Sequence, residues 1–154
     1  MLPKVDYHMH TPLCGHAKGA PKEYARHAIK VGLQDIGFSD HAPFVHKVDP
    51  RITMSMAQLP EYYRMIEEVQ SLYKSELRIK VAIEADFLPG YEEKTKKILD
   101  DYPYDYVIGS VHFINRWAFD DPEEKVKWQD KDIDTVYRDY YKLLRKSAES
   151  GLYD

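Results

Sequence analysis

The chain has a single cysteine and no long apolar run. Cys14 is the only cysteine among 154 residues, which excludes an internal disulfide and makes a reducing, cytoplasmic location the natural expectation. Residues 1–4 lead directly into a predicted strand, and no stretch has the apolar length of a signal peptide or a spanning helix. We therefore expect neither, and no membrane partner.

An excess of positive charge is also missing. The 22 basic and 26 acidic residues give a net charge of −4, and no basic block interrupts their distribution. Nucleic acid is therefore not an expected partner, because its phosphates require a concentrated basic surface. The chain is 44% hydrophobic and 13% aromatic, which is sufficient to fill the core of one globular domain.

The first informative stretch is residues 5–10, where apolar and polar residues alternate. This alternation predicts a strand in which His8 and His10 point to the same side and can share a metal ion. Pro12 then begins a loop that brings His16 close to this pair. The segment is the starting point of a predicted metal site.

Strand and helix patterns alternate along the rest of the chain. Strands are predicted over residues 33–39, 77–87 and 104–113, and helices over residues 21–31, 59–75, 91–99 and from 133 to a stop at Gly151. Irregular loops are predicted at 45–53 and 115–132. Four strand–helix repeats with mostly apolar strands are typical of a parallel α/β fold with helices outside the sheet.

Metal-binding side chains recur at the ends of the predicted strands. His41 follows the second strand, Glu84 lies near the end of the third and His112 near the end of the fourth. The carboxyl ends of such strands form the active face of an α/β barrel. Imidazoles with one carboxylate suit two or three divalent ions of Zn, Mn or Fe, which favours metal-assisted hydrolysis.

The metal-ligand interpretation leaves alternatives open. His16 can instead be a solvated loop residue, and Asp40-His41 and His112 can be core groups or groups that orient a ligand. Asp6 and Asp86 are better placed to orient a ligating imidazole than to bind metal themselves. A carboxylate on an apolar strand is costly to bury without a partner, which favours the ligand role for Glu84.

A small phosphorylated substrate requires cations in the surrounding loops. Lys47 and Arg51 in the second loop, and Arg116 after the fourth strand, are candidates to bind a phosphate. Trp117 and Phe119 are candidates to line the pocket. Solvated loop charges and loop packing are the competing interpretations of these residues.

Several short motifs resemble those of one family, the polymerase and histidinol phosphatase (PHP) superfamily. The motifs are His8-Met9-His10-Thr11, His16, Ser39-Asp40-His41, Ile83-Glu84-Ala85-Asp86 and Gly109-Ser110-Val111-His112-Phe113. They run along essentially the whole chain and are most similar to the histidinol-phosphatase branch. The resemblance implies a distorted (β/α) barrel with a trinuclear metal centre. The implied reaction is hydrolysis of L-histidinol phosphate to L-histidinol and phosphate, in histidine biosynthesis.

The resemblance also implies roles for individual residues. His8 and His10 would bind one metal, Glu84 would bridge to a second metal bound by His112, and His16 with His41 would bind the third. Through a metal-bound hydroxide, the catalytic residues would be His8, His10, Glu84 and His112.

The chain departs from the family pattern toward its end. The family supplies a further His after a fifth strand and a late Asp-x-His, and neither occurs before Asp154. A closed barrel needs about 200 residues or more. We therefore expect residues 1–154 to form a PHP domain truncated before the fifth strand, an incomplete barrel of about four βα units. A homo-oligomer is one way to cover its free strand edge.

Three functions are consistent with these observations. The first is the histidinol-phosphate phosphomonoesterase, with activity lost if the truncated chain cannot complete its centre. The second is a PHP-type metallohydrolase of another small phosphoester. The third is a degenerate, non-catalytic metal-binding domain.

Overall fold

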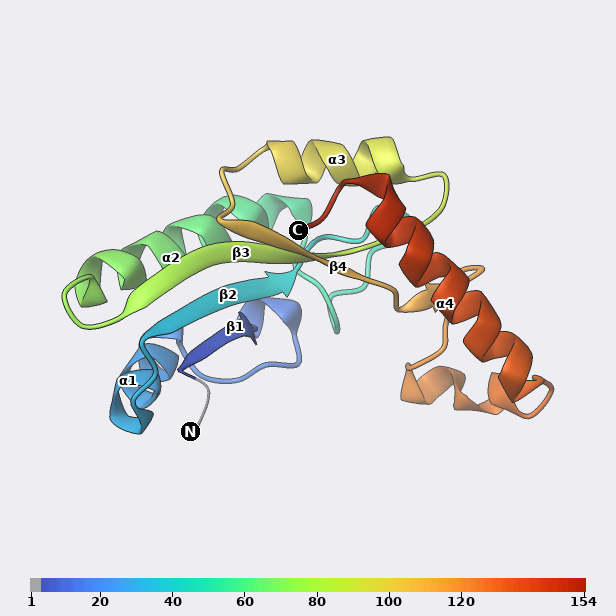
Figure 1. Cartoon of the computed structure of the whole chain (residues 1–154), viewed down its shortest axis with the longest axis horizontal. Helices are drawn as coiled ribbons and strands as arrows, with labels where there is room; N and C mark the ends of the chain where they lie inside the picture. Colours follow the sequence, from blue (N-terminus) through green and yellow to red (C-terminus); the bar gives the residue numbers. More distant parts are fainter. Residues whose placement is uncertain (1–3) are drawn as a thin grey trace.

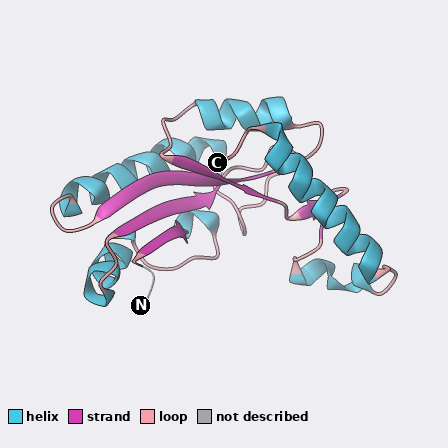
Figure 2. Cartoon of the chain, viewed as in Figure 1, coloured by secondary structure: helices cyan, strands magenta, loops and turns pink. Residues whose placement is uncertain are grey.

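The computed structural model describes residues 4–154 and shows a curved parallel sheet flanked by helices (Figure 1). The strands lie in the order β1 (Val5–Met9), β2 (Asp35–His41), β3 (Arg78–Asp86) and β4 (Tyr106–Ser110). The helices that follow them are α1 (Pro21–Val31), α2 (Leu59–Tyr73), α3 (Glu92–Asp100) and α4 (Ile133–Ser150). The predicted α/β fold of four βα units is confirmed, and its strands curl into half of a barrel (Figure 2). The expectation about a leader segment rests partly on residues 1–3, which lie outside the described residues.

The register of the sheet aligns the carboxyl ends of its strands. His41 of β2 is the direct partner of Glu84 in β3, and Asp86 of β3 is the partner of Ser110 in β4. Because all the pairs are parallel, residues far apart in the chain meet at one edge of the sheet. This edge is where the sequence predicts the site.

Alternation along the central strand separates the core from the site. Val81 and Ile83 are buried in the main hydrophobic cluster, together with Tyr62 and Ile66 of α2. Glu84 follows Ile83 and therefore points to the opposite, concave face of the sheet. The helices thus pack on the apolar face of the sheet, and polar side chains lie on the concave face.

The segment that follows β4 differs from the predicted loop at 115–132. Two short strands, β5 (Phe113–Ile114) and β6 (Trp117–Ala118), form an antiparallel hairpin, and a 3-10 helix covers Pro122–Trp128. The two turn residues, Asn115 and Arg116, have φ values of 52° and 66°. The loop prediction was wrong here because this two-residue turn contains no glycine, the usual signal for such a hairpin. The strand predicted over 104–113 is accordingly shorter and ends at Ser110.

After α4 the chain returns to the sheet. The Asp154 N–H donates to the carbonyl of Val107 at 3.0 Å, and the Val107 N–H donates to a carboxylate oxygen of Asp154 at 2.8 Å. Residues 152–154 therefore lie alongside β4. No helix within residues 4–154 has the length and apolar character needed to cross a bilayer.

Candidate metal centre

The predicted ligands converge on the carboxylate of Glu84. Its Oε2 lies 3.1 Å from Nε2 of His8, 3.3 Å from Nε2 of His10 and 3.1 Å from Nδ1 of His41. Its other oxygen lies 3.9 Å from Nε2 of His112. Histidines at the carboxyl ends of β1, β2 and β4 therefore surround one carboxylate of β3.

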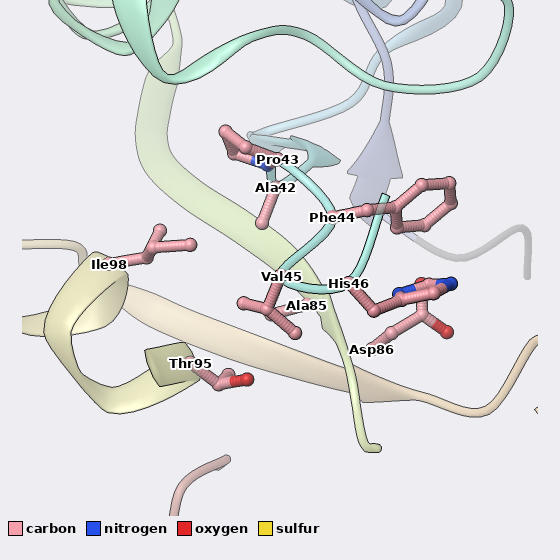
Figure 3. Close-up of a pocket in the computed structure, with 9 residues that line it drawn as sticks. All are labelled: Ala42, Pro43, Phe44, Val45, His46, Ala85, Asp86, Thr95 and Ile98. Atoms are coloured by element: carbon pink, nitrogen blue, oxygen red, sulfur yellow. The ribbon is translucent and has the colours of Figure 1, made fainter. Parts of the chain in front are cut away.

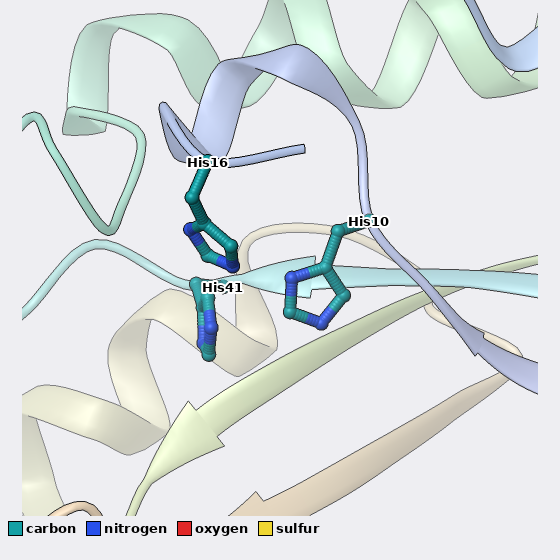
Figure 4. A group of neighbouring side chains, drawn as sticks. All are labelled: His10, His16 and His41. Atoms are coloured by element: carbon teal, nitrogen blue, oxygen red, sulfur yellow. The ribbon is translucent and has the colours of Figure 1, made fainter. Parts of the chain in front are cut away.

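The imidazoles also lie close to one another. The ring centroids of His10 and His41 are 4.5 Å apart, and His16 lies 5.4 Å from His10 and 5.3 Å from His41 (Figure 4). The centroid of the His112 ring is 5.4 Å from that of His41. His16 belongs to the loop after β1 and lies beside His10 and His41. The structure therefore brings together every side chain that was predicted to bind metal.

The predicted ligands form three groups with metal-binding geometry. The ligand atoms within each group lie within 4.8 Å of one another, and the groups are His8 with His10 and Glu84, His10 with His16 and His41, and His41 with Glu84 and His112. A fourth group of donors, His10 with Cys14 and Asp40, meets the same distance. Glu84 belongs to two groups and directs one oxygen to each side, which suits a bridging carboxylate. Imidazole nitrogen and carboxylate oxygen are the donors that Zn, Mn and Fe accept, so the residues present fit two or three such ions.

Burial and pairing determine the charge on these groups. Burial alone would raise the pKa of Glu84, but hydrogen bonds from His10 and His8 and the positive field of further imidazoles hold that pKa well below its usual range. Burial lowers the pKa of His41 to about 4. Glu84 is therefore an anion and His41 a neutral imidazole at pH 7, which are the states that bind metal.

Two imidazoles have raised pKa values. Burial opposes protonation of His10, yet hydrogen bonds with Cys14 and Glu84 and the carboxylate of Asp40 raise its pKa to about 10. Burial likewise opposes protonation of His112, but its pKa rises to about 9 because of Asp86 and Glu84. Without a bound cation both rings hold a proton that a metal ion must displace.

Buried carboxylates orient the ligands from behind. Asp86 accepts a hydrogen bond from Nδ1 of His112 at 3.0 Å, which turns Nε2 of that ring toward Glu84. Asp40 accepts from the backbone of Thr11 at 2.9 Å and lies 3.8 Å from Nδ1 of His10. The sequence predicts this orienting role for Asp86 and leaves it open for Asp40.

The expectation for Asp6 finds no counterpart in these contacts. Its carboxylate accepts a hydrogen bond from the backbone N–H of His8 at 3.2 Å, rather than one from an imidazole. Asp6 therefore shapes the local backbone of β1, and the orientation of the His8 ring comes from Glu84 instead.

The loop that holds His16 is built by local packing. Gly15 has a φ of 80°, and a Cβ at this position would overlap the backbone carbonyls of Pro50 and Arg51. Cys14 is fully buried and its Sγ accepts the N–H of Ala17 at 3.3 Å, consistent with the small packing residue expected from the sequence. The close approach of the two loops therefore depends on a residue without a side chain.

A pocket of about 260 Å³ opens beside the metal ligands. Its lining residues come from the loops after the first, second and fourth strands: His16, His41, Phe44, Arg51, Ile52, His112, Phe113, Ala118, Asp120, Asp121 and Pro122. Arg51 is the one predicted phosphate-binding residue in this set. Its guanidinium donates two hydrogen bonds to Asp49, at 2.8 and 2.9 Å, and contacts Glu123 at 2.5 Å.

The other predicted substrate contacts lie outside this pocket. Lys47 pairs with Asp49 at 3.2 Å, and Arg116 donates to the hydroxyl of Tyr91 at 3.1 Å. Trp117 is buried against Trp128, with 4.9 Å between ring centroids, in a cluster that includes Val136 of α4. The structure thus places Trp117 in the packing of α4, and its predicted contact with substrate has no geometric support.

A small cavity, of about 10 Å³, lies between the loop after β2 and α3 (Figure 3). His46 lies at its edge, beside Asp86, and packs against Phe113 with 4.6 Å between ring centroids. Partial burial lowers the pKa of His46. A space of this size holds no more than about one water, so it is not a substrate site.

Comparison with known proteins agrees with the geometry. A family model described as PHP domain matches residues 6–152. The chain is 45% identical over 149 residues to a probable histidinol-phosphatase of Deinococcus radiodurans, covering 97% of this chain and 57% of the relative. It is 32% identical over 166 residues to the histidinol-phosphatase of Bacillus subtilis, covering 98% of this chain and 62% of that protein.

A solved structure shares the fold. The crystal structure of histidinol phosphate phosphatase from Lactococcus lactis, complexed with zinc, L-histidinol and phosphate, superimposes with a TM-score of 0.68 and 29% identity. The alignment covers 77% of this chain and 43% of that one. The chain therefore spans about three fifths of the two curated relatives and less than half of this structural neighbour.

Proposed function

The chain belongs to the PHP domain family, and we propose that it forms the metal-binding part of a phosphomonoesterase that hydrolyses L-histidinol phosphate to L-histidinol and phosphate. The observation that carries this proposal is the convergence of His8, His10, His41 and His112 on Glu84. The relatives named histidinol-phosphatase support the substrate, which would place the reaction in histidine biosynthesis.

In this proposal His8, His10, His16, His41, Glu84 and His112 hold two or three divalent ions. Bound there, the ions would act as Lewis acids toward the phosphoryl group and would acidify water. The protein's own contribution is to hold the imidazole nitrogens and an ionised Glu84 in a fixed arrangement, with His41 already neutral. Asp86 retains a proton on Nδ1 of His112, so that Nε2 is the atom free to bind.

Arg51 is the favoured phosphate contact of the three predicted cations, because it alone lines the pocket beside the ligands. Its two hydrogen bonds to Asp49 hold the side chain in place and leave Nη1 facing Glu123. The Glu123 side chain is 73% exposed, so it can leave for solvent when a phosphate takes its place. Arg51 would then bind the phosphate with a guanidinium that is already oriented.

Phosphate release and metal content together test the proposal. The purified chain is stripped with a chelator, reloaded with Zn or Mn, and given L-histidinol phosphate and a set of other small phosphomonoesters. The Deinococcus relative serves as the positive control. Release from L-histidinol phosphate in preference to the other esters is expected.

Two variants link this activity to the centre. His41→Ala removes a buried ligand and should abolish both metal uptake and release, whereas His27→Ala, on the exposed side of α1, should change neither. Release of phosphate from a different ester alone would show that the chain acts on that ester and not on L-histidinol phosphate. Metal uptake without any release would favour the non-catalytic metal-binding domain.

A further inference from the structure

Strand β1 contains a bulge at the first metal ligand. Its pairing with β2 shifts register between Asp6 and Met9, so that two residues of β1, Tyr7 and His8, stand opposite one residue of β2. In a regular strand Tyr7 and Met9 would share a face. Here Met9 packs against the main hydrophobic cluster, whereas Tyr7 lies on the concave face, with its ring 5.5 Å from Nζ of Lys80 on β3. The bulge therefore determines how His8 leaves the strand.

Side chains bind both polar groups of the peptide unit inside this bulge. The N–H of His8 donates to Asp6 at 3.2 Å, and the carbonyl of Tyr7 accepts from two hydroxyls. These are the hydroxyl of Ser39 on β2, at 3.1 Å, and that of Tyr106 on β4, at 2.5 Å. A carbonyl oxygen has two lone pairs and can accept both bonds. The peptide unit next to His8 is therefore held by hydroxyls from two other strands.

The Tyr106 side chain crosses the concave face of the sheet to reach this carbonyl. Tyr106 belongs to β4, and its register partner in β3 is the small residue Ala82. In β2, a Cβ at Gly37 would lie 1.9 Å from the hydroxyl oxygen of Tyr106 and 2.8 Å from the ring carbon that bears it. The ring ends beside that of Tyr7, with 5.4 Å between centroids. The path from the fourth strand to the first is therefore open only because Gly37 has no side chain.

Bonds from inside the sheet matter here because β1 is its edge strand (Figure 1). A strand paired on one side only has half the ladder bonds of a central strand to fix its register. Loss of the bulge would shift the residues beside it by one place, which turns their side chains to the other face. Nε2 of His8 and Nε2 of His10 lie 3.1 and 3.3 Å from Oε2 of Glu84, and such a shift would break this arrangement.

We propose that Tyr106 is a positioning residue of the metal centre, whose hydroxyl holds the β1 bulge so that His8 and His10 face Glu84. The inference rests on the proposed function, because the ligands that it positions are those of the proposed centre. Tyr106 acts through the backbone of β1 and binds no metal itself. It connects the last strand of the sheet to the ligands on the first.

Zinc binding at two separate histidines tests this role. Within residues 4–154, His8 and His112 each belong to only one of the donor groups, so each reports on its own group. The probe is zinc alone, titrated into the full chain with ¹⁵N-labelled histidines and followed on the imidazole resonances. In Tyr106→Phe the zinc affinity at His8 should fall by about 10-fold, as for other residues that support a ligand, and the affinity at His112 should stay the same. A residue that only packed β4 would instead disturb His112, which follows that strand.

Tyr63→Phe is the matched control. It also removes a hydroxyl that donates to a backbone carbonyl, that of Pro103 at 3.4 Å, but from helix α2 outside the sheet. Zinc affinity should be unchanged at both histidines. The carbonyl carbon resonance of Tyr7 should move in Tyr106→Phe and not in Tyr63→Phe, which reports on the hydrogen bond itself.

Gly37→Ala is a second, independent variant. It keeps every hydroxyl but places a Cβ where the hydroxyl of Tyr106 lies, so it should also lower the zinc affinity at His8. Since both substitutions break the same hydrogen bond, the losses in the double variant Gly37→Ala/Tyr106→Phe should not add.

Each other outcome overturns the inference. Unchanged zinc affinity at His8 in Tyr106→Phe would show that its hydroxyl positions nothing. Equal losses at His8 and His112, or an unfolded variant in the amide spectrum, would make Tyr106 a residue of the fold alone. Additive losses in the double variant would separate Gly37 from the hydroxyl. In all these cases the wild-type chain still binds zinc and releases phosphate, whereas failure of the proposed function is seen in the wild-type chain itself.

Discussion

The metal centre has a buried half and an open half that are supported in different ways. Glu84 and His41 come from central strands, and their side chains are only 4% and 10% exposed. His8, from the edge strand β1, is 52% exposed, and His16 lies on an exposed loop. The buried half is held by strand register and hydrogen bonds, whereas the open half depends on the edge strand and the loop after it. The same type of ligand is thus more rigidly placed where the backbone beneath it is paired on both sides.

The largest loss of zinc affinity is expected from a substitution in the buried half. Glu84→Gln keeps the size of the side chain but removes the charge and the second anionic oxygen that serve two of the three ligand groups. Zinc affinity should fall by about 100-fold or more, beyond the 10- to 100-fold range of supporting residues. Competition titration with a chromophoric chelator measures it. Glu76→Gln, an exposed residue before β3, is the control, and normal zinc content in Glu84→Gln would contradict the bridging role.

A smaller loss of zinc affinity is expected when the carboxylate that orients His112 is removed. Asp86→Asn leaves the ligands in place but removes the carboxylate that accepts a hydrogen bond from Nδ1 of His112. We expect zinc affinity to fall by about 10- to 100-fold at the site of His112. The same titration detects this change. An unchanged affinity would mean that packing alone orients the ring.

The open half can be perturbed without touching a ligand. Gly15→Ala places a Cβ against the carbonyls of Pro50 and Arg51 and forces a non-glycine residue to a φ of 80°. The free energy of unfolding should fall by about 1–3 kcal/mol. His16 should move, so the metal content should drop only at the group of His10, His16 and His41. Denaturant unfolding and zinc content measure the two effects, and loss of all zinc would show that the two halves are coupled.

The dependence of zinc binding on pH involves both halves. His10 and His112, with pKa values of about 10 and 9, are protonated at pH 7 without metal, and zinc must displace these protons. Lower pH therefore weakens zinc binding, and affinity should rise with pH until both rings are neutral, by about 10-fold per pH unit for each proton released. Calorimetry in buffers of different ionisation enthalpy counts the protons. Zinc binding without proton release would contradict the raised pKa values.

Much of this centre was predictable from local sequence signals. Alternation over residues 5–10 predicts that His8 and His10 share a side, and their ring centroids are 5.1 Å apart. Breaks after the apolar strands predict that His41, Glu84 and His112 gather at one edge, because parallel strands end together. These signals work because strand period and strand direction are enough to place a side chain at the end of a strand.

Other features left weaker signals. The turn at Asn115 and Arg116 lacks glycine, so the β5–β6 hairpin was missed and the segment was predicted as a loop. The apolar residues on both sides of the turn were the signal that could have found it. The sequence also does not determine the role of Trp117. An aromatic residue in a loop can line a pocket or pack against a helix, depending on which surface is nearest.

The sequence by itself determined the order of strands and helices, the parallel sheet and the edge at which the ligands meet, because these follow from periodicity and chain breaks. The tertiary structure alone decided which nitrogen faces Glu84, how close Asp40 lies to His10, and that Arg51 is paired with Asp49 and Glu123. The physical reason is that hydrogen bonds between distant loops depend on distances of a few ångströms. Such distances are determined only once the packed elements fix how the loops lie against one another.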